Sequence, residues 1–229
     1  FLDKSLIGTT IIPMAGKGKR FVDKGYKKLK PLIPVSGKEM IIQALSFLPR
    51  VSHYSFAVRS NMDLSVLKKI KTKDNIIVNK KFSKDTNGQA TSAKIALDKL
   101  LKFSGKIEEP IIIGACDHGS IYNKNKLIEL INDDSVDIIV WGKRKHANAI
   151  RNPKMFGWIQ EKDNKINKIS VKEPLSNPLN DAIIIGTFVF KKSLYFRQSY
   201  EELIKNKKKI NGEYYIDSCI NEAISLGLN

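Results

Sequence analysis

Short apolar runs rich in β-branched residues alternate along this chain with segments whose apolar residues recur every three or four positions. The first pattern predicts buried strands and the second predicts one-faced helices, and their alternation is typical of βαβ units around a mainly parallel sheet. We expect strands at residues 9–14, 54–59, 76–78, 110–115 and 136–141, and helices at residues 40–48, 64–70, 88–101 and 126–131.

The pattern changes after residue 142, where the chain becomes rich in Asn, Lys and Pro. Turn signals separate three further apolar runs there, which predicts an antiparallel subregion over residues 142–190 laid against the main sheet. Its strands are expected at residues 156–160, 166–171 and 182–190, and a closing helix is expected at 214–226. We therefore predict one α/β domain over residues 1–229, with a mixed, mainly parallel sheet and helices on both of its faces.

Composition supports a folded protein, because 42% of the 229 residues are hydrophobic. The outlier is charge: 40 Lys and Arg residues against 23 Asp and Glu residues leave a net charge of +17. Such a field attracts DNA, RNA, anionic membranes or phosphorylated small molecules, and a lysine-rich proteome also produces it without any function. A polyanion-binding protein without turnover is therefore one hypothesis. No zinc spacing, aromatic-rich sheet or recognition helix accompanies the lysines, so we expect no nucleic acid partner.

The location of the protein is predicted from what the sequence lacks. No apolar run reaches the roughly 18–20 residues of a membrane span, and no signal peptide pattern opens the chain. Cys116 and Cys219 each lie beside an aspartate in an apolar segment, which indicates buried, reduced thiols. We expect a cytoplasmic protein without a membrane partner. The chain begins with Phe1 instead of Met, so other modules of a longer polypeptide are among the partners considered.

The strongest local signal follows the first predicted strand, where Gly16-Lys17-Gly18-Lys19-Arg20 is succeeded ten residues later by Lys30-Pro31. Glycines let backbone N–H groups approach a ligand, and the surrounding cations attract phosphate. The spacing matches neither the P-loop nor the three-glycine dinucleotide fingerprint. A phosphate-binding turn of another kind is predicted.

With Gly25-Tyr26 and Leu29-Lys30-Pro31-Leu32, this segment resembles the sugar-nucleotide pyrophosphorylases and related nucleotidyltransferases, which have a GT-A-like, Rossmann-like fold. Leu29 departs from the family, which has proline there, but the lysine is kept. Weaker similarity covers nearly the whole chain, at Asn87-Gly88-Gln89-Ala90, Cys116-Asp117-His118, Gly157-Trp158, Gly186-Thr187-Phe188 and Tyr215-Ile216-Asp217.

The resemblance implies an enzyme in which an acceptor phosphate attacks the α-phosphorus of a nucleoside triphosphate and pyrophosphate departs. Both reactants are anions, so positioning and charge neutralisation are the main catalytic contributions. Arg20 would contact the triphosphate and Lys30 would bridge the α-phosphate and the acceptor; the alternative is that both are solvated loop cations. The implied nucleotide-binding residues are Met14, Ala15, Gly16, Gly18, Arg20, Lys30, Gly88 and Gln89, and the catalytic ones are Arg20, Lys30 and Asp117.

Two carboxylates are the implied ligands of Mg²⁺. Asp117 follows a buried strand, at the edge where open α/β sheets bind ligands, and carboxylates with substrate phosphates are the ligands that Mg²⁺ prefers. Asp217 matches the second metal aspartate of the family, although a carboxylate at a helix start is also favoured by the helix dipole. His118 is either a donor to its neighbour or a satisfied buried histidine.

The remaining residues concern selectivity. Gly88 and Gln89 are candidates for reading a pyrimidine base, and helix capping by Thr86 or Asn87 is the alternative. Gly157, Lys172 and Glu173 resemble acceptor-binding positions, with Lys and Glu in the reverse of the usual order.

We expect CTP, UTP or dTTP as the nucleotide and a sugar 1-phosphate or similar ester as the acceptor. The product would be an activated precursor for a surface polysaccharide such as a capsule. A cytidylyltransferase acting on phosphocholine or another non-sugar phosphate ester is the alternative.

Overall fold

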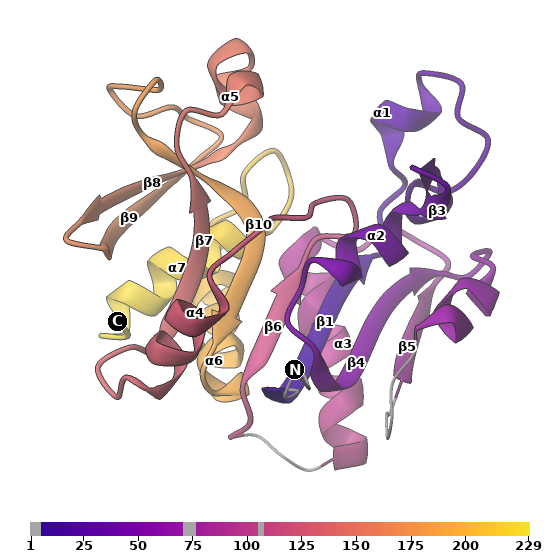
Figure 1. Ribbon diagram of the computed structural model, residues 1–229, viewed down its shortest axis with the longest axis horizontal. Helices are drawn as coiled ribbons and strands as arrows, with labels where there is room; N and C mark the ends of the chain where they lie inside the picture. The colour runs from indigo at the N-terminus through magenta and orange to yellow at the C-terminus, as the bar shows by residue number, and fades with distance from the viewer. Residues whose placement is uncertain (1–5, 71–76, 105–107) are drawn as a thin grey trace.

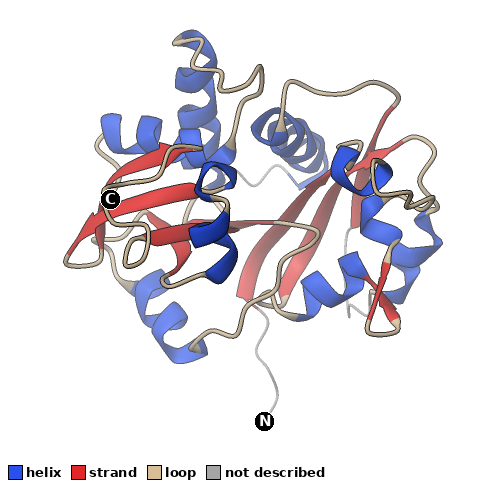
Figure 2. Cartoon of the chain, turned by 90° about the horizontal axis from the view of Figure 1, so that it is seen from above, coloured by secondary structure: helices blue, strands red, loops and turns tan. Residues whose placement is uncertain are grey.

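A computed structural model describes residues 6–70, 77–104 and 108–229 of the chain. Within these residues, eight strands form one mixed sheet, and helices cover both of its faces (Figure 1, Figure 2). In spatial order the strands are β5 (Ile77–Phe82), β4 (Val51–Arg59), β1 (Leu6–Met14), β6 (Ile111–Gly114), β10 (Ala182–Phe190), β8 (Gly157–Lys162) and β9 (Lys165–Val171), and β7 (Ile138–Lys143) also pairs with β10.

The sheet changes from parallel to antiparallel at β10. Strands β5, β4, β1 and β6 are parallel, whereas β10 runs antiparallel to β6, β7 and β8. Alternate side chains of a strand point to opposite faces, so adjacent Ile11 and Ile12 belong to two different cores, and both are fully buried. The predicted fold class, a mixed sheet between two helical layers, is confirmed.

One helical layer holds α3, α6 and α7, and the other holds α2, α4 and the 3-10 helix η2. On α3, Ala90, Ala93, Ala96 and Leu97 form a fully buried stripe at helical spacing. The bounds are α1 (Lys19–Val22), η1 (Lys30–Leu32), α2 (Met40–Ser46), η2 (Leu64–Lys69), α3 (Gln89–Ser104), α4 (Lys124–Asn132), α5 (Ala147–Arg151), η3 (Pro153–Met155), α6 (Ser193–Lys205) and α7 (Ile216–Ser225).

Most predicted elements are observed, and β10 has the predicted bounds. The expected helix at 64–70 is a 3-10 helix, and Ile76, the expected start of a strand, lies outside the described residues. The antiparallel subregion does not lie against the sheet as a separate piece: β8 and β9 continue it through β10. A separate hairpin, β2 (Pro34–Val35) and β3 (Lys38–Glu39), was not predicted, and no bounds were predicted for α1, α5 or α6.

Cys116 and Cys219 are both buried and free, as predicted. Burial raises the pKa of Cys116 to about 11 and raises the pKa of Cys219 as well, so both thiols are neutral near pH 7. Among the described helices, none combines the length and apolar character that crossing a bilayer requires.

Candidate active site

Residues 15–20, which follow β1 and are called the glycine turn from here on, lie where the strand order of the sheet reverses. From β1 the chain proceeds to β4 and β5 on one side, and later adds β6 on the other side of β1. Ligands of open α/β sheets bind at such a reversal, outside the carboxyl ends of the strands. Two segments therefore border the expected crevice. One is the glycine turn, which follows β1, and the other contains Asp117, which follows β6.

Lys30 and Asp117 meet at this crevice. The Lys30 Nζ atom lies 2.6 Å from Asp117 Oδ2, and the two side chains are 20% and 23% exposed. Gly18 adopts a φ of 63°, and a Cβ added there would lie 3.0 Å from the Cβ of Lys30, so the turn packs directly on the lysine. Lys30 is thus an ion-paired, largely buried group and not a solvated loop cation.

The carboxyl group of Asp117 is held in its charged form. Burial alone would raise its pKa, but the hydrogen bond from His118 and the charge of Lys30 outweigh burial and hold the pKa well below its usual value. His118 Nδ1 lies 3.4 Å from Asp117 Oδ1. The His118 side chain is half exposed, so the interpretation as a buried histidine is wrong and the role of donor to its neighbour fits.

Asp217 lies in the first turn of α7 and packs against β8 at Gly157. A Cβ added at residue 157 would lie only 2.2 Å from Asp217 Oδ2, so only glycine leaves room for this carboxylate. Burial raises the pKa of Asp217 to about 6, and the charge of Lys172 opposes that rise. Two predicted residues that are 60 positions apart in sequence are therefore in contact.

The predicted site residues form two groups. The first group is Lys30 with Asp117, and the second group is Gly157, Asp217 and Lys172. Lys172 has a φ of 65°, its Nζ donates to the Met155 carbonyl, and it lies 5.4 Å from the centre of the Tyr215 ring. Burial lowers its pKa, as does the charge of Arg20, whereas Asp217 raises it. Glu173 is exposed. With the order Lys then Glu, it is Lys172 whose charge acts on Asp217.

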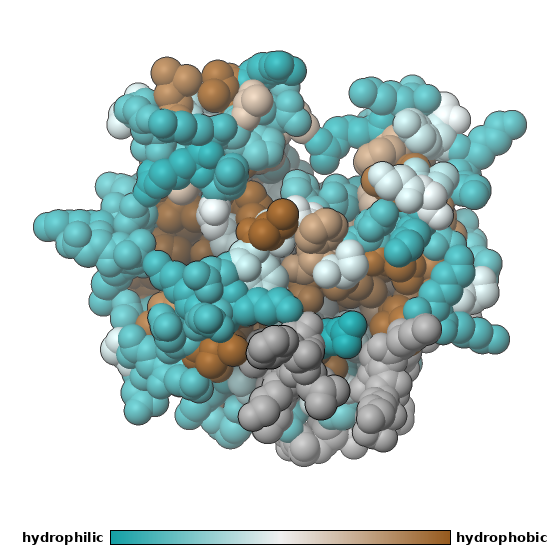
Figure 3. All heavy atoms as spheres, in the orientation of Figure 1, coloured by the Kyte–Doolittle hydropathy of each residue, from teal (hydrophilic) through white to brown (hydrophobic). Residues whose placement is uncertain are grey.

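Strand β10 joins the two groups. A Cβ at Gly157 would lie 3.3 Å from Ile184 Cδ1, and two residues further along β10 a Cβ at Gly186 would lie 3.1 Å from Ala115 Cβ, beside the Asp117 segment. The charge of Arg20 acts on both Lys172 and Tyr215, so this arginine lies within electrostatic reach of the second group. Figure 3 shows the surface hollowed between the two upper projections, which carry α5 and α1 in Figure 1.

The candidate base-reading residues are at the start of α3. Gly88 has a φ of 109°, and a Cβ there would lie 2.5 Å from the Tyr214 carbonyl oxygen, which gives this glycine a packing role. Gln89 is exposed at the first position of the helix. The Thr86 hydroxyl donates to the Gly88 carbonyl. Contact of Gly88 and Gln89 with a base stays a prediction.

Sequence reasoning missed Arg59 and Asp85, which contact the glycine turn. Asp85 is ion-paired with both Lys17 and Arg59. The available signal was position, since Arg59 is the last residue of a predicted strand and Asp85 opens the polar turn before α3.

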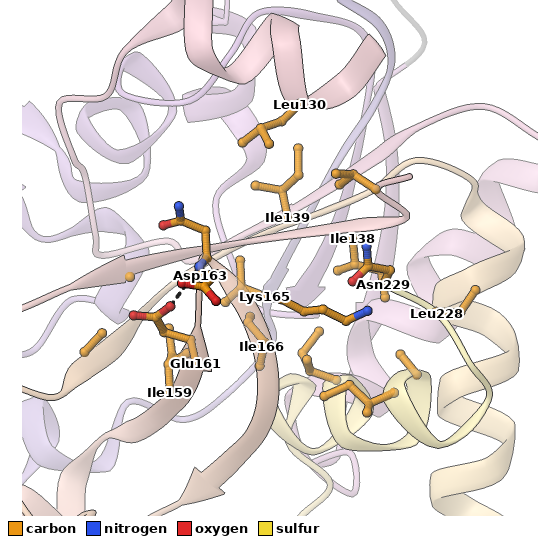
Figure 4. A pocket seen from close by; sticks show the side chains of 18 of the residues that line it. Leu130, Ile138, Ile139, Ile159, Glu161, Asp163, Lys165, Ile166, Leu228 and Asn229 are labelled. Carbon is orange, nitrogen blue, oxygen red and sulfur yellow. Dashed lines mark hydrogen bonds between the residues drawn. The ribbon is translucent and has the colours of Figure 1, made fainter. Parts of the chain in front are cut away.

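A large cavity elsewhere in the molecule is distinct from this site. It has a volume of about 530 Å³ and lies beside β7, between the β8–β9 turn, α7 and Asn229 (Figure 4). Its apolar lining includes Ile138, Ile159 and Ile166. None of the predicted site residues lines it, so it contributes nothing to the candidate active site.

Known proteins resemble this chain in sequence and in fold. Residues 9–222 match the protein family described as nucleotidyl transferase. The "Bifunctional protein GlmU" of Methanococcus aeolicus is 25% identical over 185 residues, which are 81% of this chain and 40% of that protein. The chain thus spans less than half the length of this curated relative.

Solved structures show the same fold. The nucleoside-diphosphate-sugar pyrophosphorylase from Vibrio cholerae RC9 has a TM-score of 0.74 at 20% identity, covering 96% of this chain and 89% of the other. The inositol-1-phosphate CTP transferase from T. maritima has a TM-score of 0.69 at 16% identity, covering 98% and 84%. With the family match across most of its length, the chain belongs to the nucleotidyl transferase family.

Proposed function

We propose that this chain, acting as one domain, transfers a nucleoside monophosphate from a nucleoside triphosphate to a small phosphorylated acceptor and releases pyrophosphate. The observation that carries the proposal is the contact of Lys30 with Asp117 at the reversal of strand order, beside the glycine turn. The second group, Gly157, Lys172 and Asp217, lies within electrostatic reach of Arg20 and would supply an acceptor side. Family membership supports the same reaction class.

In this reaction an oxygen of the acceptor phosphate attacks the α-phosphorus, the bond from the α-phosphorus to its bridging oxygen breaks, and that oxygen leaves on pyrophosphate. Backbone N–H groups of residues 14–18 hold the triphosphate, and Arg20 neutralises the leaving pyrophosphate. Lys30 draws the α-phosphate and the attacking phosphate together, which offsets the repulsion between two anions. Lys172 holds the acceptor phosphate next to Gly157.

The carboxylates fit Mg²⁺. In the described residues no group of three or more His, Cys, Asp and Glu side chains forms a ready-made metal cage. Mg²⁺ does not need one, because it takes one or two carboxylates and completes its shell with water and phosphate oxygens. Asp117, held ionised, and Asp217 would bind it. Bound there, Mg²⁺ would act as a Lewis acid toward the α-phosphate.

Two substrate assignments remain proposals. We favour CTP, UTP or dTTP with a sugar 1-phosphate, in the cytoplasmic synthesis of a surface polysaccharide precursor. A cytidylyltransferase for a non-sugar phosphate ester is the second candidate, because a neighbour of the same fold is named an inositol-1-phosphate CTP transferase. The exposed Gln89 amide is the group that would distinguish the bases.

The test is pyrophosphate release from a panel of nucleoside triphosphates that includes CTP, UTP and dTTP. Each is paired with sugar 1-phosphates, inositol 1-phosphate and phosphocholine. We expect release with one pyrimidine nucleotide and one acceptor class, and its loss in Asp117→Asn. Asp134→Asn, an exposed aspartate outside the site, is the matched control. Folded protein that releases no pyrophosphate with any pair would overturn the proposal.

Removal of Mg²⁺ with EDTA should lower the rate of the active pair by at least about 100-fold, because the α-phosphate loses several kcal/mol of charge stabilisation. Excess MgCl₂ should restore the rate fully, as measured by pyrophosphate release. A rate that persists in EDTA would contradict the assignment of Asp117 and Asp217 as metal ligands.

Replacing Lys172 with methionine should raise the KM for the acceptor about tenfold or more, because a charged hydrogen bond contributes roughly 1.5–3 kcal/mol. The KM for the nucleotide should change little. Lys168→Met, which changes an exposed lysine on β9, the strand just before Lys172, is the control and should match the parent chain. An equal rise in both KM values would place Lys172 outside the acceptor side.

A further inference from the structure

Asp85 forms a bridge between two segments of the nucleotide side of the site. Its Oδ2 atom lies 2.7 Å from Lys17 Nζ, and its Oδ1 atom lies 2.8 Å from Arg59 Nη1. Arg59 is only 17% exposed, and the same Nη1 atom lies 3.5 Å from the Ala15 carbonyl oxygen. One carboxylate thus uses both oxygens to hold two cations, one of them in the turn after β1 and the other at the end of β4.

The register of the sheet explains how these residues meet. Met14 at the end of β1 is paired with Val58 on β4, and Arg59 is paired with Phe82 on β5. The residues that follow these strand ends are Ala15, Ser60 and Ser83, so the turn after β1 and the loop after β5 flank Arg59. This bridge lies on the β4 side of the glycine turn, whereas Lys30 and Asp117 lie on its β6 side.

The loop that begins at Asp85 is also fixed at its other end. The Asn87 carbonyl accepts from Tyr214 N at 2.7 Å, and Ala90 N donates to the Tyr214 carbonyl at 3.1 Å. Tyr214 is three residues before Asp217. Gly88 packs so closely on the Tyr214 backbone that no side chain would fit at position 88. The segment carrying Gly88 and Gln89 is therefore tied to the glycine turn through Asp85 and to the start of α7 through its backbone.

We propose that Asp85 is a positioning residue for the nucleotide, which sets the distance between the loop at residues 85–89 and the glycine turn through Lys17 and Arg59. This inference rests on the proposed function, in which the turn holds the triphosphate and the loop faces the base. A nucleotide spans both segments at once, so their separation decides which nucleotide fits. Arg59 suits this role because its planar, multi-donor group reaches Ala15 and Asp85 together.

A purely structural role makes a different prediction. Asp85 is 46% exposed, and an ion pair with so much solvent contact contributes little to folding stability. Loss of the bridge should therefore leave the melting temperature nearly unchanged. Its effect should appear in nucleotide binding and not in acceptor binding.

The experiment compares Asp85→Asn, Arg59→Lys and the double variant with Asp98→Asn, which removes the similarly exposed Lys94–Asp98 ion pair away from the site. Binding of Mg-CTP, Mg-UTP and Mg-dTTP is measured by calorimetry, and both KM values are measured with the active pair. We expect the nucleotide Kd and KM to rise about tenfold in each single variant, equivalent to about 1.4 kcal/mol. The double variant should be no worse than the singles, and acceptor KM and melting temperature should not change.

Three outcomes would overturn the inference. These are nucleotide affinity in Asp85→Asn equal to that of the parent chain, equal increases in both KM values, and tighter nucleotide binding, which would mean that Asp85 competes with the triphosphate for Lys17. Failure of the parent chain to bind any of the three nucleotides would instead overturn the proposed function, so the two failures are distinguishable.

Discussion

Replacing Lys30 with methionine should lower kcat/KM by about 100- to 1,000-fold, the usual cost of removing one preorganised charge from a site where negative charge develops. Methionine keeps much of the apolar stem that packs near Gly18 and Phe21, so the chain should stay folded. The loss is expected because Lys30 is the cation held at the reversal of strand order, where the attacking phosphate and the triphosphate must approach each other.

The same variant separates charge neutralisation from metal binding. The Lys30 ammonium contacts Asp117 Oδ2, so its removal frees that oxygen. We therefore expect Mn²⁺, used as a paramagnetic substitute for Mg²⁺, to bind Lys30→Met at least as tightly as the parent chain. Lys24→Met changes an exposed lysine of the same loop and should keep full activity. Activity of Lys30→Met within threefold of the parent chain would contradict the role of Lys30.

The sequence allowed the meeting of the glycine-turn segment with Asp117 to be predicted, because that segment and Asp117 each come after a buried strand. Lys30 and Asp117 are 87 positions apart, yet Lys30 was expected beside the α-phosphate and Asp117 at the carboxyl end of a strand where a ligand binds, and the structure brings the two into contact. The bridge between Arg59 and Asp85 could not be predicted in this way. It depends on the register between β4 and β5, which brings together an arginine and an aspartate 26 residues apart.

The bounds of helix α6 could not be predicted from apolar periodicity. Its buried face includes Ser193, Phe196, Ser199 and Leu203, so two of the four positions are polar. The Ser199 hydroxyl donates to the Tyr195 carbonyl and is thereby satisfied inside the core. A sequence pattern that counts only apolar residues does not detect such a face.

The structure also bears on the excess of lysine. Lys208 donates to the buried Glu222 at 2.7 Å, and Lys209 lies 5.1 Å from the centre of the Tyr214 ring. Both lie just after α6 and, with Lys205 and Lys207, form a basic run that favours the polyanion-binding hypothesis when the sequence is taken alone. These two lysines have partners within the fold, which weakens the case that the run binds polyanions.

Replacing Gly157 with alanine should weaken the apparent affinity of the active enzyme for Mg²⁺ by about 10- to 100-fold, the range seen when groups that orient metal ligands are changed. The added Cβ would lie 2.2 Å from Asp217 Oδ2, so the carboxylate would have to turn away. We expect the Mg²⁺ concentration for half-maximal pyrophosphate release to rise, with partial recovery of the rate at high Mg²⁺.

A double-mutant cycle with Asp217→Ala tests the cause, because Gly157→Ala should add little once the carboxylate is absent. Additive losses would show that Gly157 acts through another contact, such as a direct one with the acceptor, and that the position of Asp217 is not what this glycine protects.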